Sequence, residues 1–405
     1  MTSTSISRGT ERGLAQGLAR VTGRALGPYQ SAVVRIGFSF TWLFFLLREW
    51  PHRRELYGPD GPWNLDMARR MIDGNGAFTT LMWSDSGAWF EFVYVCAIAA
   101  AVLLLLGWRT RTMSVLFMVG VLSVQNRSIF MGDGGDNVIH LMAVYLVLTR
   151  CGQVWSLDAR RRERSRAGCG TGARDTTGVV LWSVLGTALA AATFLDRLSW
   201  GWALVFWGMW TIHGVWWAVR RYAREENPAT REAATVLDVV ANIVHNGALL
   251  VIMAEVCLIY ATAGWYKVQG SRWQDGTALY YPMHLDYFSP WPALSDLLGS
   301  SGVLVMLITY GTVIVQVAFP FTLFNRRVKN VLLALMMLEH LGIAVALGLP
   351  FFSLAMIAAD AVFLPTRFLR WVGGWAGRLR FRRPARALRK PGESGSAQPD
   401  RTLVG

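Results

Sequence analysis

The sequence predicts an all-α protein, a polytopic bundle of about ten transmembrane helices with both termini in the cytoplasm. Three observations lead to this prediction. First, 53% of the 405 residues are hydrophobic and only 16% are charged, with 19 tryptophans and 20 phenylalanines, which exceeds the apolar content of ordinary soluble domains. Second, apolar runs long enough to cross a bilayer recur along the chain. Third, basic residues collect in alternate connections between those runs.

The predicted spans follow from the apolar runs, because a hydrocarbon core of about 30 Å takes roughly 20 helical residues to cross. They lie near residues 31–49, 88–107, 112–131, 137–149, 178–196, 198–219, 235–264, 302–324, 328–347 and 350–365. The fourth and tenth runs are short, and 178–219 also fits a reentrant or interfacial hairpin. Counts of eight or nine spans therefore stay open.

The distribution of arginine and lysine predicts which connections face the cytoplasm. The basic ones are residues 1–30, Arg109 with Arg111, 150–177 with seven arginines and three acidic residues, 220–224, 326–329 and the tail. The opposite connections, chiefly 50–87 and 265–301, have no comparable excess. Because cytoplasmic loops carry the basic excess, we expect an even number of spans in a multi-pass protein of the plasma membrane.

The two ends of the chain are expected to flank one transmembrane domain, 31–365, in which 160–232 resembles an insertion of two spans. Residues 1–30 are polar and basic and lack a cleavage site before the first apolar run, so that run is expected to stay as an anchor. Residues 366–405 begin with alternating basic and aromatic residues and end rich in Gly, Ser and Pro. This tail is predicted to be an amphipathic helix on anionic membrane lipid, followed by a disordered end.

Composition also excludes several classes of function. The net charge of +14 is not accompanied by any nucleic-acid reading motif, so we expect no nucleic-acid partner. The 4 cysteines form no Cys-x-x-Cys pair, and no His-Glu-x-x-His spacing, phosphate-binding glycine loop or Gly-x-Ser-x-Gly elbow is present. We therefore expect no metal site.

The first candidate cluster combines Gln125-Asn126-Arg127-Ser128 with the Gly-rich segment 132–137 and His140. The glycines permit a tight turn that would bring Arg127, Asp136 and His140 together. The structural alternative is an Arg127–Asp136 ion pair with a capped helix start, and for these two residues alone it is the favoured interpretation.

The second cluster lies along 235–267. Asp238, Asn242 and His245 share one helical face, which must pack against other helices. Glu255 falls inside an apolar run and needs a partner such as Arg35, Arg127 or a histidine, because ionisable groups are costly in the membrane. Lys267 stands at the outer end near Trp273, either as an interface lysine that reaches water or as a desolvated base.

The third cluster is formed by Gln316, Pro320, His340 and Asp360 in the last three predicted spans. A lone histidine in an apolar helix is more often a hydrogen-bonded core residue than a ligand. Glu339 points to another face of its helix than His340, so the pair is not a metal motif.

An ordered series of motifs in these regions resembles the horizontally transferred transmembrane domain family, which is related to the vitamin K-dependent γ-glutamyl carboxylases. The series is Arg35-Ile36, Tyr57-Gly58-Pro59-Asp60-Gly61, Asn126-Arg127, Gly134 to His140, Ser156-Leu157-Asp158-Ala159, Tyr260, Ala263-Gly264, Lys267, Trp273, Gly276, Gln316, Pro320, His340, Phe351-Phe352-Ser353 and Phe363-Leu364-Pro365. It covers nearly the whole span from 31 to 365.

The resemblance implies a quinol-dependent oxygenase or carboxylase-like modifying enzyme. Lys267 matches the lysine that deprotonates a reduced naphthoquinone, a menaquinone or vitamin K-like cofactor, and His140 matches a histidine that organises that site. A site closed to water suits such chemistry. Supporting or substrate-binding roles are expected for Arg35, Arg127, Asp136, Glu255, Trp273 and His340.

The sequence departs from the carboxylases after Pro365, where only a basic tail replaces their large lumenal region. Relatives of this size include proteins resembling the maturation factor of a sporulation-delaying peptide toxin, which work with a second protein. The competing prediction is therefore a non-enzymatic membrane helper in peptide maturation or export, with a peptide substrate or maturation partner. In that case Lys267, His140 and Arg127 would only stabilise helix packing.

Overall fold

The computed structural model describes residues 3–167, 175–222 and 228–381, and all secondary structure in these ranges is helical. The all-α prediction is confirmed for them. The predicted disordered end of the tail lies outside the described residues, as do 168–174 and 223–227 within the predicted insertion.

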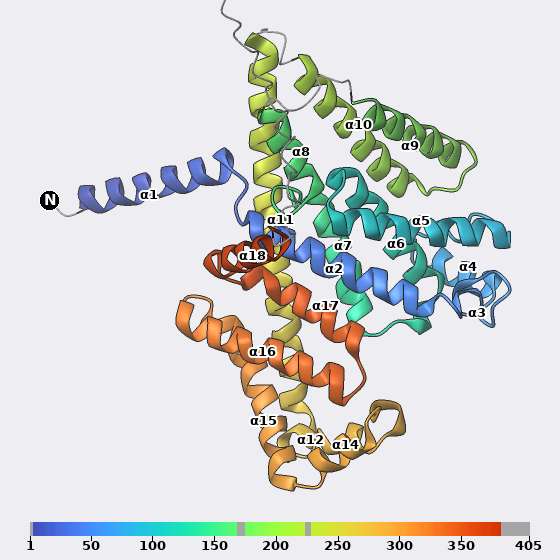
Figure 1. The fold of residues 1–405 in the computed structure, drawn as a ribbon, viewed down its shortest axis with the longest axis vertical. Helices are drawn as coiled ribbons and strands as arrows, with labels where there is room; N and C mark the ends of the chain where they lie inside the picture. The colour runs from blue at the N-terminus through green and yellow to red at the C-terminus, as the bar shows by residue number, and fades with distance from the viewer. Residues whose placement is uncertain (1–2, 168–174, 223–227, 382–405) are drawn as a thin grey trace, which may run out of the picture.

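Helix α11 (Pro228–Gln269) runs along the long axis of the molecule, vertical in Figure 1. Its 42 residues give a length of about 63 Å, roughly twice the hydrocarbon thickness of a bilayer. Most of the earlier helices lie beside its amino-terminal part, and the later short helices surround its carboxyl end (Figure 1). The helix therefore connects the two ends of the molecule.

The other helices follow in chain order. Before α11 come α1 (Ser3–Gly23), α2 (Pro28–Glu49), α3 (Arg53–Tyr57), α4 (Leu65–Asp73), α5 (Gly87–Leu106), α6 (Thr110–Arg127), η1 (Ile129–Met131), α7 (Gly134–Leu148), α8 (Leu157–Arg166), α9 (Thr176–Phe194) and α10 (Trp200–Tyr222). After it come α12 (Ser271–Gln274), α13 (Tyr280–Met283), η2 (Asp286–Phe288), α14 (Pro292–Gly299), α15 (Gly302–Ala318), η3 (Phe319–Thr322), α16 (Arg326–Ala346), α17 (Pro350–Asp360), η4 (Ala361–Phe363) and α18 (Thr366–Phe381).

Within the described ranges, 6 helices are long and apolar enough to cross a membrane, or 7 if one bent pair is a single span. The six are α2, α5, α9, α11, α15 with η3, and α16, and the bent pair is 350–363 with 366–378, at an angle of 115°. All ten predicted runs fall on helices. However, α7 has only 15 residues, α6 ends in Gln-Asn-Arg, and α10 has two arginines, Arg220 and Arg221, in its last turn.

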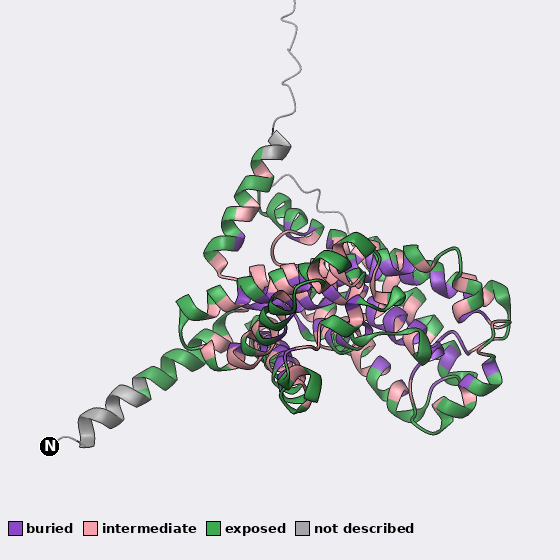
Figure 2. Ribbon diagram, turned by 90° about the horizontal axis from the view of Figure 1, so that it is seen from below, coloured by how far each residue is buried: buried purple, intermediate pink, exposed green. Residues whose placement is uncertain are grey.

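The core lies where α2 packs against α5 and α17, and where α6 packs between α5 and α7. Trp42, Phe38 and Tyr94 are fully buried there, and the buried residues gather inside the bundle in Figure 2. Two of these contacts need glycine. A Cβ built on Gly37 of α2 would lie 2.5 Å from the Cβ of Ala358 on α17, and one on Gly120 of α6 would lie 2.9 Å from that of Ala97 on α5. Small residues let these membrane helices approach closely.

The polar stripe at the beginning of α11 binds other parts of the chain, as predicted. Asn242 donates to the carbonyl of Thr22, and Asn246 accepts from the amide of Leu26. His245 contacts the carbonyl of Leu26 at 2.8 Å and accepts from the amide of Arg150 at 2.9 Å. These contacts attach the connection between α1 and α2, and the end of α7, to α11.

Two aspartates at the same end of the bundle cap neighbouring helices. Asp158 accepts from the backbone amides of Arg109 and Thr110 at 2.9 and 2.8 Å, which caps α6. Asp175 caps α9 and pairs with Arg109, whose hydrogen bond lowers the pKa of Asp175 to about 2. The carboxylate therefore stays charged at neutral pH and connects α9 to α6.

We predict that Gly37→Ala destabilises the protein by about 1–3 kcal/mol, because the added methyl group overlaps Ala358 and forces α2 away from α17. The measurement is the melting temperature of the purified protein in detergent. Gly342→Ala on α16 is the matched control, since nothing lies within 4 Å of its built Cβ and alanine favours a helix by about 0.5–1 kcal/mol. Equal melting temperatures for the wild type and Gly37→Ala would contradict close packing at this crossing.

Candidate functional site

Lys267 lies near the carboxyl end of α11 in a line of three hydrogen-bonded side chains. Its Nζ donates to Oε1 of Gln316 on α15 at 2.6 Å, and Nε2 of Gln316 donates to Oε1 of Glu339 on α16 at 2.5 Å. Gln316 is buried. The amide thus joins the amine to a carboxylate and orients both.

Trp273 lies over this amine because the chain reverses after α11. The helix stops at Gly270, and the amide of Trp273 donates back to the Gly270 carbonyl at 3.0 Å. The Lys267 Nζ lies 5.2 Å from the centre of the Trp273 ring, within the range of a cation–π contact. The predicted association of Lys267 with Trp273 is present in the structure.

A second polar set lies deeper, where the Tyr260 hydroxyl meets a histidine and a carboxylate. The hydroxyl oxygen is 3.0 Å from Nε2 of His340, and it donates to Oδ2 of Asp360 at 3.0 Å. Tyr260, His340 and Asp360 are 1%, 2% and 0% exposed. Within the described residues, Nδ1 of His340 and Oδ1 of Asp360 are buried without a hydrogen-bond partner. His340 is thus hydrogen-bonded, as expected of a core histidine, but keeps one open nitrogen.

The two sets share two helices. Tyr260 and Lys267 are seven residues apart on α11, which is two turns on one face, and Glu339 and His340 are adjacent on α16. Consistent with the prediction, Glu339 and His340 face different neighbours: Glu339 bonds to α15, and His340 bonds to α11. Helices α11, α15, α16 and α17 therefore enclose one polar region.

His140 belongs to a different cavity, one of 430 Å³ lined by both predicted Gly-rich and Gln-Asn motifs. His140 Nδ1 is 3.0 Å from Oε1 of Gln125, and Nε2 of Gln125 donates to the carbonyl of Asp136 at 2.8 Å. Tyr57, the first residue of the Tyr57-Gly58-Pro59-Asp60-Gly61 motif, also lines the cavity. The partners of His140 are thus on α6 and α7, whereas those of Lys267 are on α15.

The predicted Arg127–Asp136 ion pair is wrong, and the helix start predicted to be capped at Asp136 is capped by Asp133, with Asp136 as its capping-box partner. Asp136 Oδ2 accepts from the amide of Asp133, and Asp133 Oδ1 accepts from those of Gly135 and Asp136, which forms a capping box at the start of α7. Arg127 instead donates through Nη2 to two backbone carbonyls, those of Gly58 and Trp63, at 2.7 and 2.8 Å. The carboxylate was unavailable because the helix start already uses it.

The start of α17 lies between the cavity and the deeper polar set. The Phe351 ring is 5.8 Å from that of Phe45, which lines the cavity, and the Phe352 ring is 5.6 Å from that of His340. A Cβ on Gly135, in the first turn of α7, would lie 2.6 Å from the Cα of Phe352, so this close approach requires glycine. These aromatic residues connect the two candidate regions.

The two other predicted supporting residues have structural partners. The expected arginine or histidine partner of Glu255 is wrong: Oε1 accepts from the hydroxyl of Tyr145 at 3.3 Å. Arg35 is fully buried and donates through Nη2 to the carbonyl of Trp155 at 2.8 Å. Because Trp155 has a φ of 51°, this bond supports a strained connection before α8.

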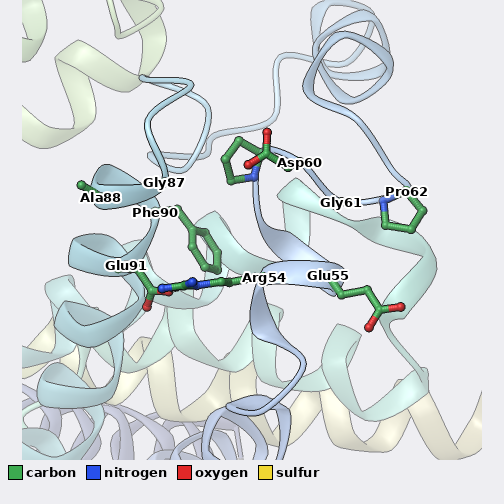
Figure 3. A pocket seen from close by; sticks show the side chains of 10 residues that line it. Arg54, Glu55, Asp60, Gly61, Pro62, Gly87, Ala88, Phe90 and Glu91 are labelled. Carbon is green, nitrogen blue, oxygen red and sulfur yellow. The ribbon is translucent and has the colours of Figure 1, made fainter.

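An open cavity of 670 Å³, larger than the one at His140, lies near the beginning of α5, between α5 and α3 (Figure 3). Arg54 lies against Glu91 in this view, and Glu91 accepts from both Arg53 and Arg54 at 2.9 and 2.5 Å. Sequence reasoning did not select this cavity, because its charges lie on the short helix α3, in the loop after it and near the start of α5, where surface ion pairs are common.

Sequence reasoning also missed Glu339. Its side chain was set aside because it does not share a face with His340, but that same geometry turns it towards Gln316. The available signal was its position inside an apolar run, which requires a partner for a carboxyl group. Among the described residues, no group of three or more His, Cys, Asp or Glu side chains could hold a metal ion.

We predict that Arg127→Lys loosens the segment 58–63. A lysine ammonium on a flexible side chain would replace the planar guanidinium that donates to the carbonyls of Gly58 and Trp63. We expect the free energy of unfolding to fall by roughly 1–3 kcal/mol and proteolysis between α3 and α4 to become faster. Arg70→Lys on exposed α4 is the control and should behave as the wild type. Wild-type proteolysis of the Arg127 variant would show that the guanidinium does not hold this loop.

No family model, curated protein or solved structure matches the chain. The resemblance to the horizontally transferred transmembrane family therefore stays a prediction from the motifs.

Proposed function

We propose that this chain is a quinol-dependent oxygenase or carboxylase-like modifying enzyme in which Lys267 acts as the base. The observation that supports this function best is the line Lys267–Gln316–Glu339 with the Trp273 ring beside the amine. A neutral amine that donates one N–H to Gln316 keeps its lone pair for a proton from a substrate. Gln316 is the positioning residue, and Glu339 orients its amide.

The residues around Lys267 suit a reduced naphthoquinone. Such a molecule has two hydroxyl groups, a flat ring and an apolar tail. Lys267 offers an acceptor for a hydroxyl proton, and Trp273 offers a ring face for stacking. The neighbouring faces of α11 and α15 are exposed and apolar at Trp265, Leu307 and Ile314, so a membrane-dissolved tail has a surface to follow. When bound, the quinol would be the molecule that reacts with dioxygen.

The polar region behind Lys267 keeps water away from the reacting end of such a site. Tyr260, His340 and Asp360 bond to one another and are buried. Their hydrogen bonds hold α11, α16 and α17 together, so α11 presents Lys267 at a constant position. The His140 cavity, joined to this region through Phe351 and Phe352, is the proposed place for the molecule that is modified, such as a peptide.

The finer topology is also a proposal: ten spans in the plasma membrane with both ends in the cytoplasm. It is supported by the positions of the basic residues, since Arg109, Arg150 and Arg220 stand at helix ends near one another, opposite the end of α11 that bears Lys267. In this proposed topology Lys267 lies toward the outer leaflet.

We predict that the purified protein consumes oxygen when given reduced menaquinone, and that Lys267→Ala lowers the rate by about 10²–10⁴-fold, the range of a lost general base. Gln316→Leu should lower kcat by about tenfold, because the amine loses its orientation. Lys329→Ala is the control. This lysine lies near the beginning of α16, away from Glu339, and its hydrogen bond among the described residues goes to the carbonyl of Phe363.

Two results would refute the catalytic proposal: no turnover with any naphthoquinol, or the same turnover in the wild type and the folded Lys267 variant. Either one would favour the alternative of a non-enzymatic helper in peptide maturation. Co-purification of a partner or precursor peptide would then be the next observation to seek.

We predict that a reporter enzyme fused after Arg166 is active only in the cytoplasm, and that one inserted at residue 84 is active only outside. The reason is the basic excess of 150–177 compared with 50–87. Alkaline phosphatase and a cytoplasmic fluorescent reporter measure the two sides in parallel. Activity of both fusions on one side would overturn the proposed alternation.

A further inference from the structure

Three arginines from separate parts of the chain surround one tryptophan at the basic end of the bundle. The guanidinium carbons of Arg111, Arg150 and Arg220 lie 4.0, 6.0 and 5.0 Å from the centre of the Trp216 ring. Arg111 belongs to the first turn of α6, Arg150 follows α7, and Arg220 lies in the last turn of α10. We call Arg111, Arg150, Arg220 and Trp216 the arginine cluster.

The charges of the arginine cluster are not balanced. Asp238 on α11 accepts from Arg220 at 2.5 and 2.6 Å and from Arg150 at 3.3 Å, and Arg150 also donates to Asn242 at 2.6 Å. Among the residues that the structure describes, the Arg111 guanidinium has neither a hydrogen-bond nor an ion-pair partner. Among the described residues of this cluster and its partners, three positive charges thus meet one negative charge, a surplus of two.

One further arginine near the cluster adds positive charge. Arg162 on α8 donates to the carbonyl of Gly152, a neutral acceptor, and so keeps its full charge. Arg109 is different, because Asp175 neutralises it. Like charges held this close repel one another, so an added anion would be attracted strongly to the unpaired Arg111.

The surroundings of the cluster suit a lipid better than a soluble anion. Apolar side chains are exposed on α10 beside Trp216, namely Val215, the residue before it, and Ile212, one helical turn before it. Trp216 lies among helix ends, the depth at which tryptophan meets the headgroup region. Basic pockets between membrane helices on the cytoplasmic side bind phosphate headgroups.

We propose that the arginine cluster binds an anionic phospholipid with two phosphates in its headgroup. The surplus of two positive charges matches two phosphates, and guanidinium groups bind phosphate oxygens in pairs. The acyl chains run along the exposed apolar face of α10. This binding holds the α9–α10 hairpin against α11, and it is independent of the chemistry proposed at Lys267.

The decisive variant is Arg111→Gln, because among the described residues the Arg111 side chain has no hydrogen-bond or ion-pair partner that the change would leave unpaired, and its contact is with the Trp216 ring. The probe is cardiolipin, added to the purified protein in a neutral detergent and followed by native mass spectrometry and by melting temperature. We expect cardiolipin to bind the wild type and raise its melting temperature, and Arg111→Gln to bind it about fivefold more weakly. Without lipid, the variant should melt at or above the wild-type temperature, since a repulsive charge is gone.

Arg221→Gln is the matched control, because Arg221 is the next residue on α10 and its guanidinium lies over Trp217, 5.7 Å from the ring centre. It should bind cardiolipin as the wild type does. Equal binding by Arg111→Gln and wild type would overturn the proposal. Equal affinity for phosphatidylglycerol would overturn the two-phosphate headgroup, and equal stabilisation by inorganic phosphate would overturn a lipid in favour of a soluble anion.

Discussion

The cost of placing polar side chains among apolar helices determines where this protein keeps its chemistry. Four buried or half-buried polar groups along α11 meet partners from other parts of the chain: Asn242 and His245 near the beginning, Tyr260 further on, and Lys267 near the end. Because an unpaired polar group in such surroundings costs several kcal/mol on transfer scales, these bonds select one arrangement of the helices around α11. Helix α11 thus positions the candidate site through the same contacts that hold the bundle together.

Close packing imposes the second constraint, because the polar bonds reach only if the helices approach closely. Gly37 lets α2 contact α17, and Gly135 lets the first turn of α7 contact Phe352. On α11, a Cβ at Gly264 would lie 2.6 Å from the side chain of Val317 on α15. This contact stands between Tyr260 and Lys267 in sequence, so it brings α15 near enough for Gln316 to bond the amine. Small residues and polar residues therefore act together at the candidate site.

The sequence was sufficient to predict helices and their approximate ends, because apolar runs and their basic flanks follow from the thickness and charge of a bilayer. It was also sufficient to group Gln316, His340 and Asp360, since each is costly within an apolar run. Pairings were harder to predict. Arg127 and Asp136 have opposite charges and lie close in sequence, but Asp136 is used by the capping box and Arg127 by two carbonyls. Backbone acceptors carry no sequence signal, so such partners become visible only in three dimensions.

The length of α11 separates two kinds of chemistry. Asp238 and Lys267 are 29 residues apart, which is about 44 Å along one helix. Over that distance their direct electrostatic interaction is screened, because the Debye length is about 8 Å in physiological salt. Any influence of the arginine cluster on Lys267 must therefore pass through a displacement of α11 as a body. Such a displacement would strain the bonds of Tyr260 to His340 and Asp360, which lie between the two ends. These buried bonds thus oppose movement of α11, and they keep Lys267 in register with Gln316 whether or not the basic end is occupied.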